Sequence, residues 1–392
     1  MIPGSDRLLT RPFALLVSAH FLQALGYSSM LMLPLYLDFL GASRTEIGTA
    51  MAVSAVGSLL LRPAVGWALD TVGRKPVLFA GTATLIVGML LVGAIDRMGP
   101  LVYGMRLIVG VGVGVLFAGY FTLAADQIPE SRRTEGLALF GISGLLPLFL
   151  HPFAERVVGD PSQLRWFFPI VGAAIALSLL PLIFIPDPGN HRRPEPIRFA
   201  EARDALLAPP LFPVWTATGF FAGLVSVFMA FVLVVAESRG MPNPATIWFT
   251  YAGGAVSVRF FGARLPDRVG PAKVGFVALG CYIAGFFGVA AAVEMHHFLI
   301  AGACAGVGHG YCFPVVSGQV VTRSPARLRG IAIAMFTGMW GVGGLALTPI
   351  FGAIADARGD TVMMQSAGAF GAFGLVLWML LERRYAPRAQ GA

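Results

Sequence analysis

The sequence is short of charge. Only 12% of its 392 residues are charged, whereas 56% are apolar. A soluble protein of this length needs about twice that share of charged residues to cover its surface. The composition therefore excludes an ordinary soluble protein and favours a chain that lies in a bilayer, where lipid replaces water as the solvent.

Residues that carry enzymatic or metal chemistry are also scarce. The three cysteines, Cys281, Cys304 and Cys312, lie in apolar stretches, and their spacing matches no zinc or redox motif. The sequence shows no Ser/His/Asp set, phosphate loop or metal cluster, so we expect no enzyme activity, no cofactor and no metal site. The net charge of +8 comes from dispersed residues, which argues against a nucleic-acid partner.

Twelve apolar stretches are long enough to cross a bilayer core of about 30 Å. We expect each to form a helix, because a helix pairs its backbone groups internally in lipid. The predicted fold class is all-α integral membrane with twelve transmembrane helices. The expected spans are 12–37, 45–69, 76–95, 100–126, 133–158, 164–185, 211–236, 243–263, 271–293, 297–321, 327–355 and 361–381.

Basic residues are distributed unevenly between alternate connections. If the N-terminus is inside, the connections on its side hold 19 of the 28 Lys and Arg residues, and those on the other side hold 6. Lys and Arg are enriched in the cytoplasmic loops of membrane proteins. We therefore expect a multi-pass protein of the bacterial inner membrane with both termini in the cytoplasm.

A polar stretch at 186–210 divides the chain into six spans plus six. Its prolines predict an extended first part, and the segment 199–208 predicts a short surface helix. We expect an N-terminal six-helix bundle over 1–185, a cytoplasmic linker over 186–210 and a C-terminal six-helix bundle over 211–392.

The two halves repeat each other. GVGVG at 110–114 matches GVGHG at 306–310 at an offset of 196 residues, and the run is interpreted as helix packing because no strand precedes it. At an offset of 197, Asp70 matches Asp267 and Gly73 matches Gly270. Duplicated six-span halves predict a substrate site at their interface near the middle of the membrane.

The connection after the second span reads Gly66-Trp-Ala-Leu-Asp70-Thr-Val-Gly73-Arg74-Lys75. It resembles the signature loop of the major facilitator superfamily, G-x-x-x-D-x-x-G-[RK]-[RK]. We expect Gly66 to let two helices approach closely and Gly73 to permit a tight turn. Asp70 can pair with Arg74 and cap the N-terminus of the eleventh span. This latch would hold the outward-facing state; a loop whose charges only set the topology is the alternative.

A second copy of this loop follows the eighth span, over 262–271. It keeps Asp267 and Gly270 but has Pro271 where the first copy has Arg74. We therefore expect the second copy to be a weaker latch.

The fourth span carries Arg106-Leu-Ile-Val-Gly110-Val-Gly112, which resembles the R-x-x-x-G-x-G motif of the same superfamily. A buried arginine is costly in a membrane and normally faces a cavity or a partner, and the resemblance implies that Arg106 assists proton transfer. Asp126 ends this span. We expect it to join the latch, with capping of the next helix as the alternative.

Polar residues mark the expected substrate cavity, which the resemblance places between spans one, four, seven and ten. His20, Gln23 and Tyr27 share one face of the first span, although hydrogen bonding to a neighbouring helix is an equal alternative for them. The remaining candidates for substrate contact, beside Arg106, are Ser226, Met229, His309 and Phe313. Such a cavity suits an amphipathic solute better than a sugar.

Proton coupling has fewer candidates, because the sequence places no acidic residue near the centre of a span. A carrier needs a group that titrates near physiological pH. The coupling candidates are Arg106, His309, Asp38, His151 and Glu155, and His20 is a further histidine that could carry the proton.

The sequence as a whole predicts a secondary transporter that moves a small organic solute by alternating access and acts as a monomer. Proton-coupled efflux by an antiporter is preferred, because motifs such as RPxxGxxxD resemble the branch of drug, sugar and metallophore exporters. The fifth span has Gly141, Gly144 and Pro147 but only a broken form of the antiporter element G-P-x-x-G-G. A uniporter or importer of a metabolite, or a non-transporting membrane sensor on the same fold, stays open.

Overall fold

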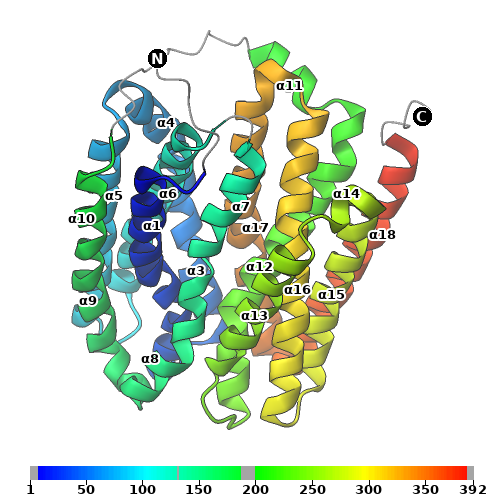
Figure 1. The fold of residues 1–392 in the computed structure, drawn as a ribbon. Coiled ribbons are helices and arrows are strands. Elements are labelled where there is room, and N and C mark those ends of the chain that lie inside the picture. Colours follow the sequence, from blue (N-terminus) through cyan, green and yellow to red (C-terminus); the bar gives the residue numbers. More distant parts are fainter. Residues whose placement is uncertain (1–7, 130–131, 187–198, 386–392) are drawn as a thin grey trace. The chain divides into compact units, whose positions relative to one another are not determined.

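The structure is a computed structural model that describes residues 8–129, 132–186 and 199–385. Within these ranges the chain forms α-helices, short 3₁₀ helices and connecting turns, without strands. Contacts group the described residues into two units (Figure 1). Unit 1 holds the residues up to Ala42 and those from Val53 to Pro186, and unit 2 holds Ser43–Ala52 and the residues from Phe199 onward.

Unit 1 contains the first six expected spans. Its elements are α1 (Arg11–Ser29), η1 (Met30–Met32), α2 (Leu33–Phe39), the second half of α3 (Arg44–Leu60), α4 (Arg62–Thr71), α5 (Arg74–Leu91), η2 (Val92–Ala94), α6 (Pro100–Gln127), α7 (Arg133–Ser143), η4 (Leu146–Leu150), α8 (His151–Val158), η5 (Pro161–Gln163), α9 (Leu164–Ala174), η6 (Ile175–Ser178) and α10 (Leu179–Ile183).

Unit 2 contains the last six expected spans and the first half of α3. Its other elements are α11 (Phe199–Leu206), η7 (Pro209–Leu211), α12 (Phe212–Ser238), α13 (Thr246–Phe261), α14 (Leu265–Val269), α15 (Pro271–Ala291), α16 (Met295–Arg323), η8 (Ala326–Leu328), α17 (Arg329–Arg358) and α18 (Asp360–Tyr385). The short helix expected at 199–208 is confirmed by α11. Most of the predicted linker lies outside the described residues, and the division into two moving bundles stays a prediction.

The expected spans are largely helical in the described residues. Nine helical segments there are long and apolar enough to cross a membrane, or ten if the bent pair α3–α4 counts as one span. The two expected spans that fall short are 133–158, which is broken into α7, η4 and α8, and 243–263, where α13 has 16 residues. All twelve expected stretches therefore correspond to helical segments of differing regularity.

Proline accounts for the bend in the second span and for the break in the fifth span. The axis bends by 43° between α3 and α4, where Pro63 lies in the first turn of α4 and lacks the N–H that a continuous helix would need. In the fifth span, α7 ends at Ser143, Gly144 follows, and Pro147 lies in the first turn of η4. The broken glycine and proline pattern of the sequence thus coincides with a break in the helix.

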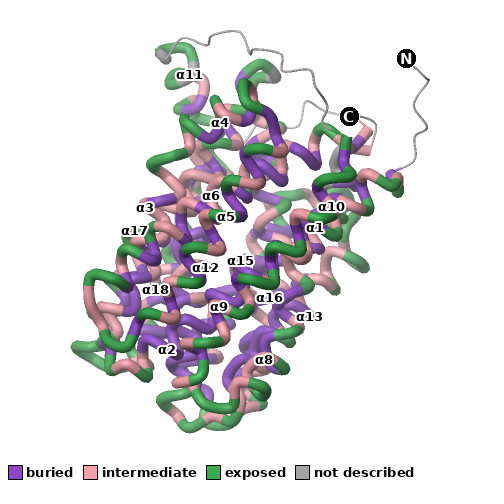
Figure 2. The backbone as a smooth tube through the Cα atoms, turned by 90° about the vertical axis from the view of Figure 1, so that its left-hand side faces the viewer, coloured by how far each residue is buried: buried purple, intermediate pink, exposed green. Residues whose placement is uncertain are grey.

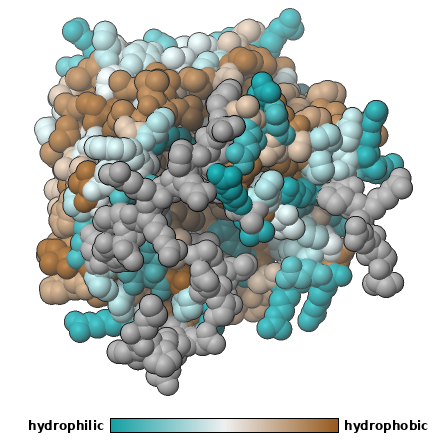
Figure 3. All heavy atoms as spheres, turned by 90° about the horizontal axis from the view of Figure 1, so that it is seen from above, coloured by the Kyte–Doolittle hydropathy of each residue, from teal (hydrophilic) through white to brown (hydrophobic). Residues whose placement is uncertain are grey.

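Large apolar side chains are exposed along the spans, as expected for surfaces that face lipid. Ile170 in α9 is 68% exposed and Val277 in α15 is 69% exposed, and exposed positions recur along the helices in Figure 2. Hydrophilic side chains gather at the end that carries α11, where Figure 3 shows them standing out at the rim. The exposed surface therefore follows the pattern of a membrane protein.

The internal repeat is visible in the backbone. Gly73 precedes α5 with φ of 111°, and Gly270 precedes α15 with φ of 107°. Residues that carry a Cβ atom rarely adopt a positive φ of this size, so both turns require glycine. The predicted helix packing of the glycine runs is also confirmed: a Cβ on Gly110 would lie 1.9 Å from the carbonyl oxygen of Ser54, and one on Gly306 would lie 2.0 Å from that of Tyr251.

Candidate functional site

The first signature loop is built around a buried arginine. Arg74, at the start of α5, is 9% exposed. Its Nε donates a hydrogen bond to the Asp126 carboxylate at 2.9 Å, and its NH1 donates to the Leu69 carbonyl at 2.6 Å. The Asp70 carboxylate lies 3.7 Å from NH1. Arg74 therefore ties the ends of α4 and α6 to the start of α5. We call Asp70, Arg74 and Asp126 the inner latch, after the predicted orientation and the predicted role of the loop.

Two expectations about this loop have different outcomes. The structure brings Asp70, Arg74 and Asp126 together within unit 1, while the predicted cap on the eleventh span stays a prediction. The expected close helix approach at Gly66 stays a prediction. Within unit 1, no neighbouring helix of the described residues comes within 4 Å of the position that a Cβ on Gly66 would take.

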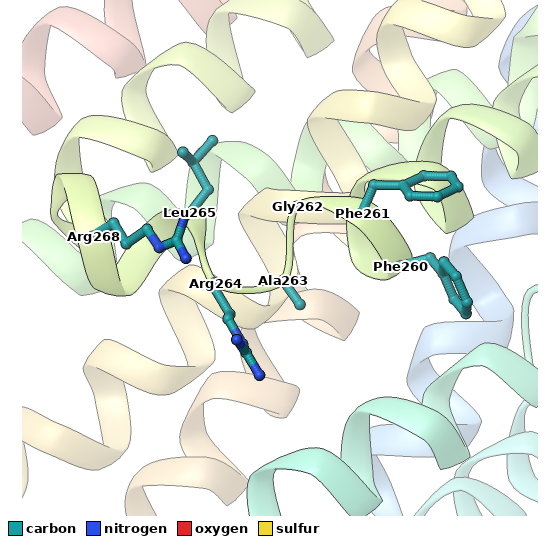
Figure 4. A pocket seen from close by; sticks show the side chains of 7 residues that line it. All are labelled: Phe260, Phe261, Gly262, Ala263, Arg264, Leu265 and Arg268. Carbon is teal, nitrogen blue, oxygen red and sulfur yellow. The ribbon is translucent and has the colours of Figure 1, made fainter.

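The second signature loop lacks a buried arginine. Pro271 begins α15, and the arginines of this loop, Arg264 and Arg268, are exposed beside a cavity of about 550 Å³ (Figure 4). Neither guanidinium has an acidic partner among the described residues. Asp267 is exposed and does not line the cavity. The two copies therefore share a backbone turn and differ in their charge contacts.

The end of α16 is anchored by another ion pair. Arg323 donates through NH1 to the Glu382 carboxylate at 3.0 Å and to the Pro210 carbonyl at 3.0 Å. Its side chain is 9% exposed and that of Glu382 is 12% exposed. Arg323, the last residue of α16, therefore joins α16, η7 and α18, whereas Asp126 lies one residue before the end of α6.

The polar face of the first span contacts the broken fifth span. His20 Nδ1 shares a hydrogen bond with Ser143 Oγ at 2.7 Å, and Tyr27 donates to the Gly144 carbonyl at 3.3 Å. Gln23 is buried between them, and its Nε2 has no hydrogen-bond partner among the described residues. For His20 and Tyr27 the structure thus shows the alternative of hydrogen bonding to a neighbouring helix. Gln23 leaves one unused donor on the same face.

Arg106 and its counterpart in the second half differ in the space around them. Arg106 is buried in α6. At the matching position Gly302, a Cβ would lie 2.5 Å from the Ile247 side chain. Because α16 packs so closely on α13 there, no side chain fits, and unit 2 has no equivalent of Arg106.

His309 lies in an aromatic cluster of unit 2. Its Nδ1 and the Tyr251 hydroxyl are 2.5 Å apart. The rings of Phe221, Trp340 and Phe313 have their centroids 5.5, 5.9 and 6.4 Å from the imidazole. Trp340 also contacts Phe313, with their centroids 5.4 Å apart. The cluster joins α12, α13, α16 and α17 and presents mainly apolar faces around one imidazole.

The two candidates on α12, Ser226 and Met229, make no hydrogen bond to another helix in the described residues. Ser226 donates to the Ala222 carbonyl of its own helix at 2.9 Å, and a Cβ on Gly344 would lie 2.9 Å from its Oγ. Met229 is half-buried. Ser226 therefore lies at the contact of α12 with α17, and the structure does not bring either residue into contact with the aromatic cluster.

The remaining coupling candidates all lie in unit 1. His151 is buried at the start of α8, and its Nδ1 has no hydrogen-bond partner among the described residues. Asp38 and Glu155 are half-buried near the ends of α2 and α8. Among the described residues, His20 contacts Ser143, Tyr120 and Phe140 and none of these three candidates.

A polar cluster that the sequence reading missed joins the start of α3 to α17 and α18 within unit 2. Asp356 accepts hydrogen bonds from the backbone N–H groups of Arg44 and Thr45, each at 2.8 Å. The Arg44 guanidinium donates to Asp360 at 3.1 Å, and Ser238 donates to the same carboxylate at 2.9 Å. We call Arg44, Thr45, Asp356 and Asp360 the outer cap.

The backbones of α3 and α17 approach closely beside the outer cap. A Cβ on Gly352 would lie 2.4 Å from the Arg44 carbonyl oxygen, and one on Gly48 would lie 2.3 Å from that of Thr348. Thr348 also donates to the Gly48 carbonyl at 2.8 Å. The D-x-x-x-D spacing of Asp356 and Asp360 at the end of a span could have indicated this cluster. The partner of Asp356 is Arg44, which is 312 residues away in sequence.

The sequence matches the Major Facilitator Superfamily over residues 16–296 and 260–392. The chain belongs to this superfamily. An uncharacterized MFS-type transporter of Salmonella typhimurium is 25% identical over 371 residues, which cover 91% of this chain and 92% of the relative. An uncharacterized MFS-type transporter of Burkholderia mallei is 23% identical over 367 residues, covering 89% and 86%.

Solved structures agree on the fold. The nucleoside transporter NupG has a TM-score of 0.81 at 13% identity, covering 94% of this chain and 99% of its own. A POT family transporter in complex with 5-aminolevulinic acid has a TM-score of 0.80 at 13% identity, covering 96% and 97%. This superfamily member is therefore a multi-pass secondary transporter of small molecules with the all-helical fold of its family, and not an enzyme.

Proposed function

We propose that this transporter exports a small amphipathic organic solute from the bacterial cytoplasm by proton-coupled alternating access. The observation that carries the proposal is a pair of buried histidines, one in each unit, each packed against aromatic rings. His20 lies with its ring centroid 4.3 Å from that of Phe140 and 5.2 Å from that of Tyr120. His309 lies among Phe221, Trp340 and Phe313.

These surroundings favour an amphipathic solute. Aromatic faces offer a large apolar contact area, while an imidazole and a few donors fix orientation. Gln23 supplies a buried and unused amide donor next to His20 and Tyr27. Ser226 and Met229 complete the proposed substrate face on α12. A sugar, which needs many hydrogen-bond partners, would find few in either cluster.

The histidines are also the proposed proton carriers. Imidazole is the side chain that ordinarily titrates between pH 5 and 8, and neither His20 nor His309 contacts a carboxylate in the described residues. Arg106 would assist by disfavouring a second positive charge in unit 1. His151, Asp38 and Glu155 are the secondary candidates for coupling.

The inner latch is the proposed control of access from the predicted cytoplasmic side. Arg74 fixes the loop and positions Asp70, which would then cap the eleventh span. Gly73 supplies the turn that this arrangement needs, and its φ of 111° supports that role. Asp267 and Gly270 form the weaker second copy, because no arginine holds Asp267 in place.

The function can be tested without knowing the solute. We expect cells that express the chain to lose one or more amphipathic metabolites from the cytoplasm and accumulate them in the medium, as measured by untargeted metabolite comparison with cells that lack it. Addition of that solute to everted membrane vesicles should dissipate an imposed pH gradient. Accumulation inside the cells would contradict export, and transport that is independent of the pH gradient would contradict proton coupling.

Variants then test the proposed site. His309→Ala should reduce solute-driven proton movement at least tenfold. The matched control His296→Ala changes an exposed histidine at the start of the same helix, 59% exposed, and should transport like the original chain. Retained transport in both His309→Ala and Gln23→Ala would show that the substrate face is misplaced.

A further inference from the structure

The turn between α13 and α14 forms a cavity that the transport cycle does not explain. It has a volume of about 550 Å³ and is lined by Phe260 and Phe261 at the end of α13, and by Arg264, Leu265 and Arg268 beyond the turn. All of these side chains are exposed. A cavity of this volume is within the range that small ligands occupy.

One side of this cavity is basic. Arg264 and Arg268 are four residues apart, and Figure 4 shows both guanidinium groups on the same side of the turn, away from the phenylalanines. Among the described residues no acidic side chain pairs with either of them. Two neighbouring cations without a protein counter-ion attract an anion, and a guanidinium binds phosphate through two parallel N–H donors.

The other side of the cavity is apolar and exposed. Phe260 is 69% exposed and Phe261 is 85% exposed, and both lie at the end of a membrane helix. Exposed phenylalanines at the end of a membrane helix are suited to contact acyl chains, which avoids the free-energy cost of hydrating both rings. The cavity thus joins a phosphate-binding side to a chain-binding side across the Gly262–Ala263 turn.

We propose that this cavity binds an anionic phospholipid, with its phosphate between Arg264 and Arg268 and its acyl chains along Phe260 and Phe261. Basic pockets beside transmembrane helices are typical sites for acidic lipid headgroups. Free phosphate would use only the arginines and would leave the phenylalanines unexplained. A zwitterionic headgroup would bring its own cation next to two others.

The experiment uses the full-length chain in dodecylmaltoside with dioleoylphosphatidylglycerol as the probe, and native mass spectrometry to count bound lipid. The double variant Arg264→Gln/Arg268→Gln should bind this lipid about thirtyfold more weakly, equivalent to about 2 kcal/mol for two basic residues. The matched control is Arg383→Gln/Arg384→Gln, which removes the same charge from two exposed arginines at the end of α18 and should leave the affinity within twofold.

Further arms separate the sources of phosphate. Dioleoylphosphatidylcholine should bind equally to all variants, and inorganic phosphate at the same concentration should not displace phosphatidylglycerol. Phe261→Ser should weaken the dioleoyl lipid more than a dihexanoyl lipid. The proposal is overturned if the loop variant and the control bind phosphatidylglycerol equally, if phosphatidylcholine binds as tightly at this site, or if inorganic phosphate competes on equal terms. Unchanged unfolding midpoints of the variants would show that altered binding reflects the site and not the fold.

Discussion

The two signature loops have the same turn and opposite charge arrangements around it. In unit 1 the helix that packs beside the loop carries Asp126 in its last turn, and Arg74 of the loop is buried against it. In unit 2 the matching helix ends in Arg323, which pairs with Glu382 of α18 instead, and the loop arginines are left at the surface. The two loops therefore differ in whether an arginine of the loop is held by an acidic residue near the end of the neighbouring helix.

This difference shows how a duplicated fold can acquire two uses for one motif. The backbone requirement is unchanged, because Gly73 and Gly270 both have positive φ. The side-chain contacts differ between the two loops, because Pro271 cannot make the hydrogen bonds that Arg74 makes. We infer that the first loop controls access to the substrate and that the second is free to contact lipid.

The largest expected effect concerns the anchor of unit 2. Glu382→Gln should lower the free energy of unfolding by about 3 kcal/mol, because Arg323 would keep its buried charge without a counter-ion. The shift would be measured as a lower midpoint of thermal unfolding in detergent. Asp204→Asn, which changes an exposed carboxylate of α11, is the control and should change the midpoint little. Equal midpoints for Glu382→Gln and the control would show that the Arg323–Glu382 ion pair does not stabilise unit 2.

The same measurement on the inner latch should give the next largest effect. Arg74→Gln leaves Asp126 without its partner, but the Asp126 side chain is 27% exposed and water stabilises part of its charge. We expect a loss of about 2 kcal/mol. A smaller loss than for Arg264→Gln would reverse the ranking of the two loops.

The outer cap should contribute less. Asp356→Asn weakens the hydrogen bonds that Asp356 accepts at the start of α3 and removes a negative charge from that helix N-terminus. We expect a loss of about 1 kcal/mol and faster hydrogen exchange at residues 43–46. Asp204→Asn, which changes an exposed carboxylate of α11, is the control. Unchanged exchange at 43–46 would show that the cap does not fasten α3.

The smallest effect on stability is expected for the lipid loop. Arg264→Gln/Arg268→Gln should change the free energy of unfolding by less than about 0.5 kcal/mol, as is usual for exposed residues without partners. Thermal unfolding in lipid-free detergent is the measurement. A loss comparable with that of Arg74→Gln would mean that these arginines have a structural role within unit 2.

Local features of the sequence predicted much of the fold. The hydropathy of a stretch is set by consecutive residues in the sequence, so the membrane-spanning stretches and the short polar helix α11 could be predicted. The D-x-x-G spacing likewise predicted two related turns, because a turn that needs a positive φ almost always has glycine at that position, and glycine can be seen in the sequence. The resemblance carried by these motifs led to the superfamily.

Contacts between distant residues could not be predicted in the same way. Arg323 and Glu382 are 59 residues apart, and Arg44 and Asp356 are 312 apart; nothing in either local pattern selects the partner. The role expected for Gly66 stays a prediction, because a glycine in a motif can mark either a close approach or an open face. The His20 stripe had two equal interpretations, since spacing identifies a polar face but not whether water or a helix meets it.

Hydrogen-exchange mass spectrometry of the full chain in nanodiscs tests most directly whether the first loop, and not the second, controls access. It would compare Asp70→Asn with the matched variant Asp267→Asn, without any solute. We predict that Asp70→Asn raises exchange in the peptides around residues 66–75 and 120–129, and lowers it around 40–46 and 352–362, as the protein shifts toward the inward-open state. Asp267→Asn should leave both regions unchanged. Unchanged exchange in Asp70→Asn together with altered exchange in Asp267→Asn would contradict the account.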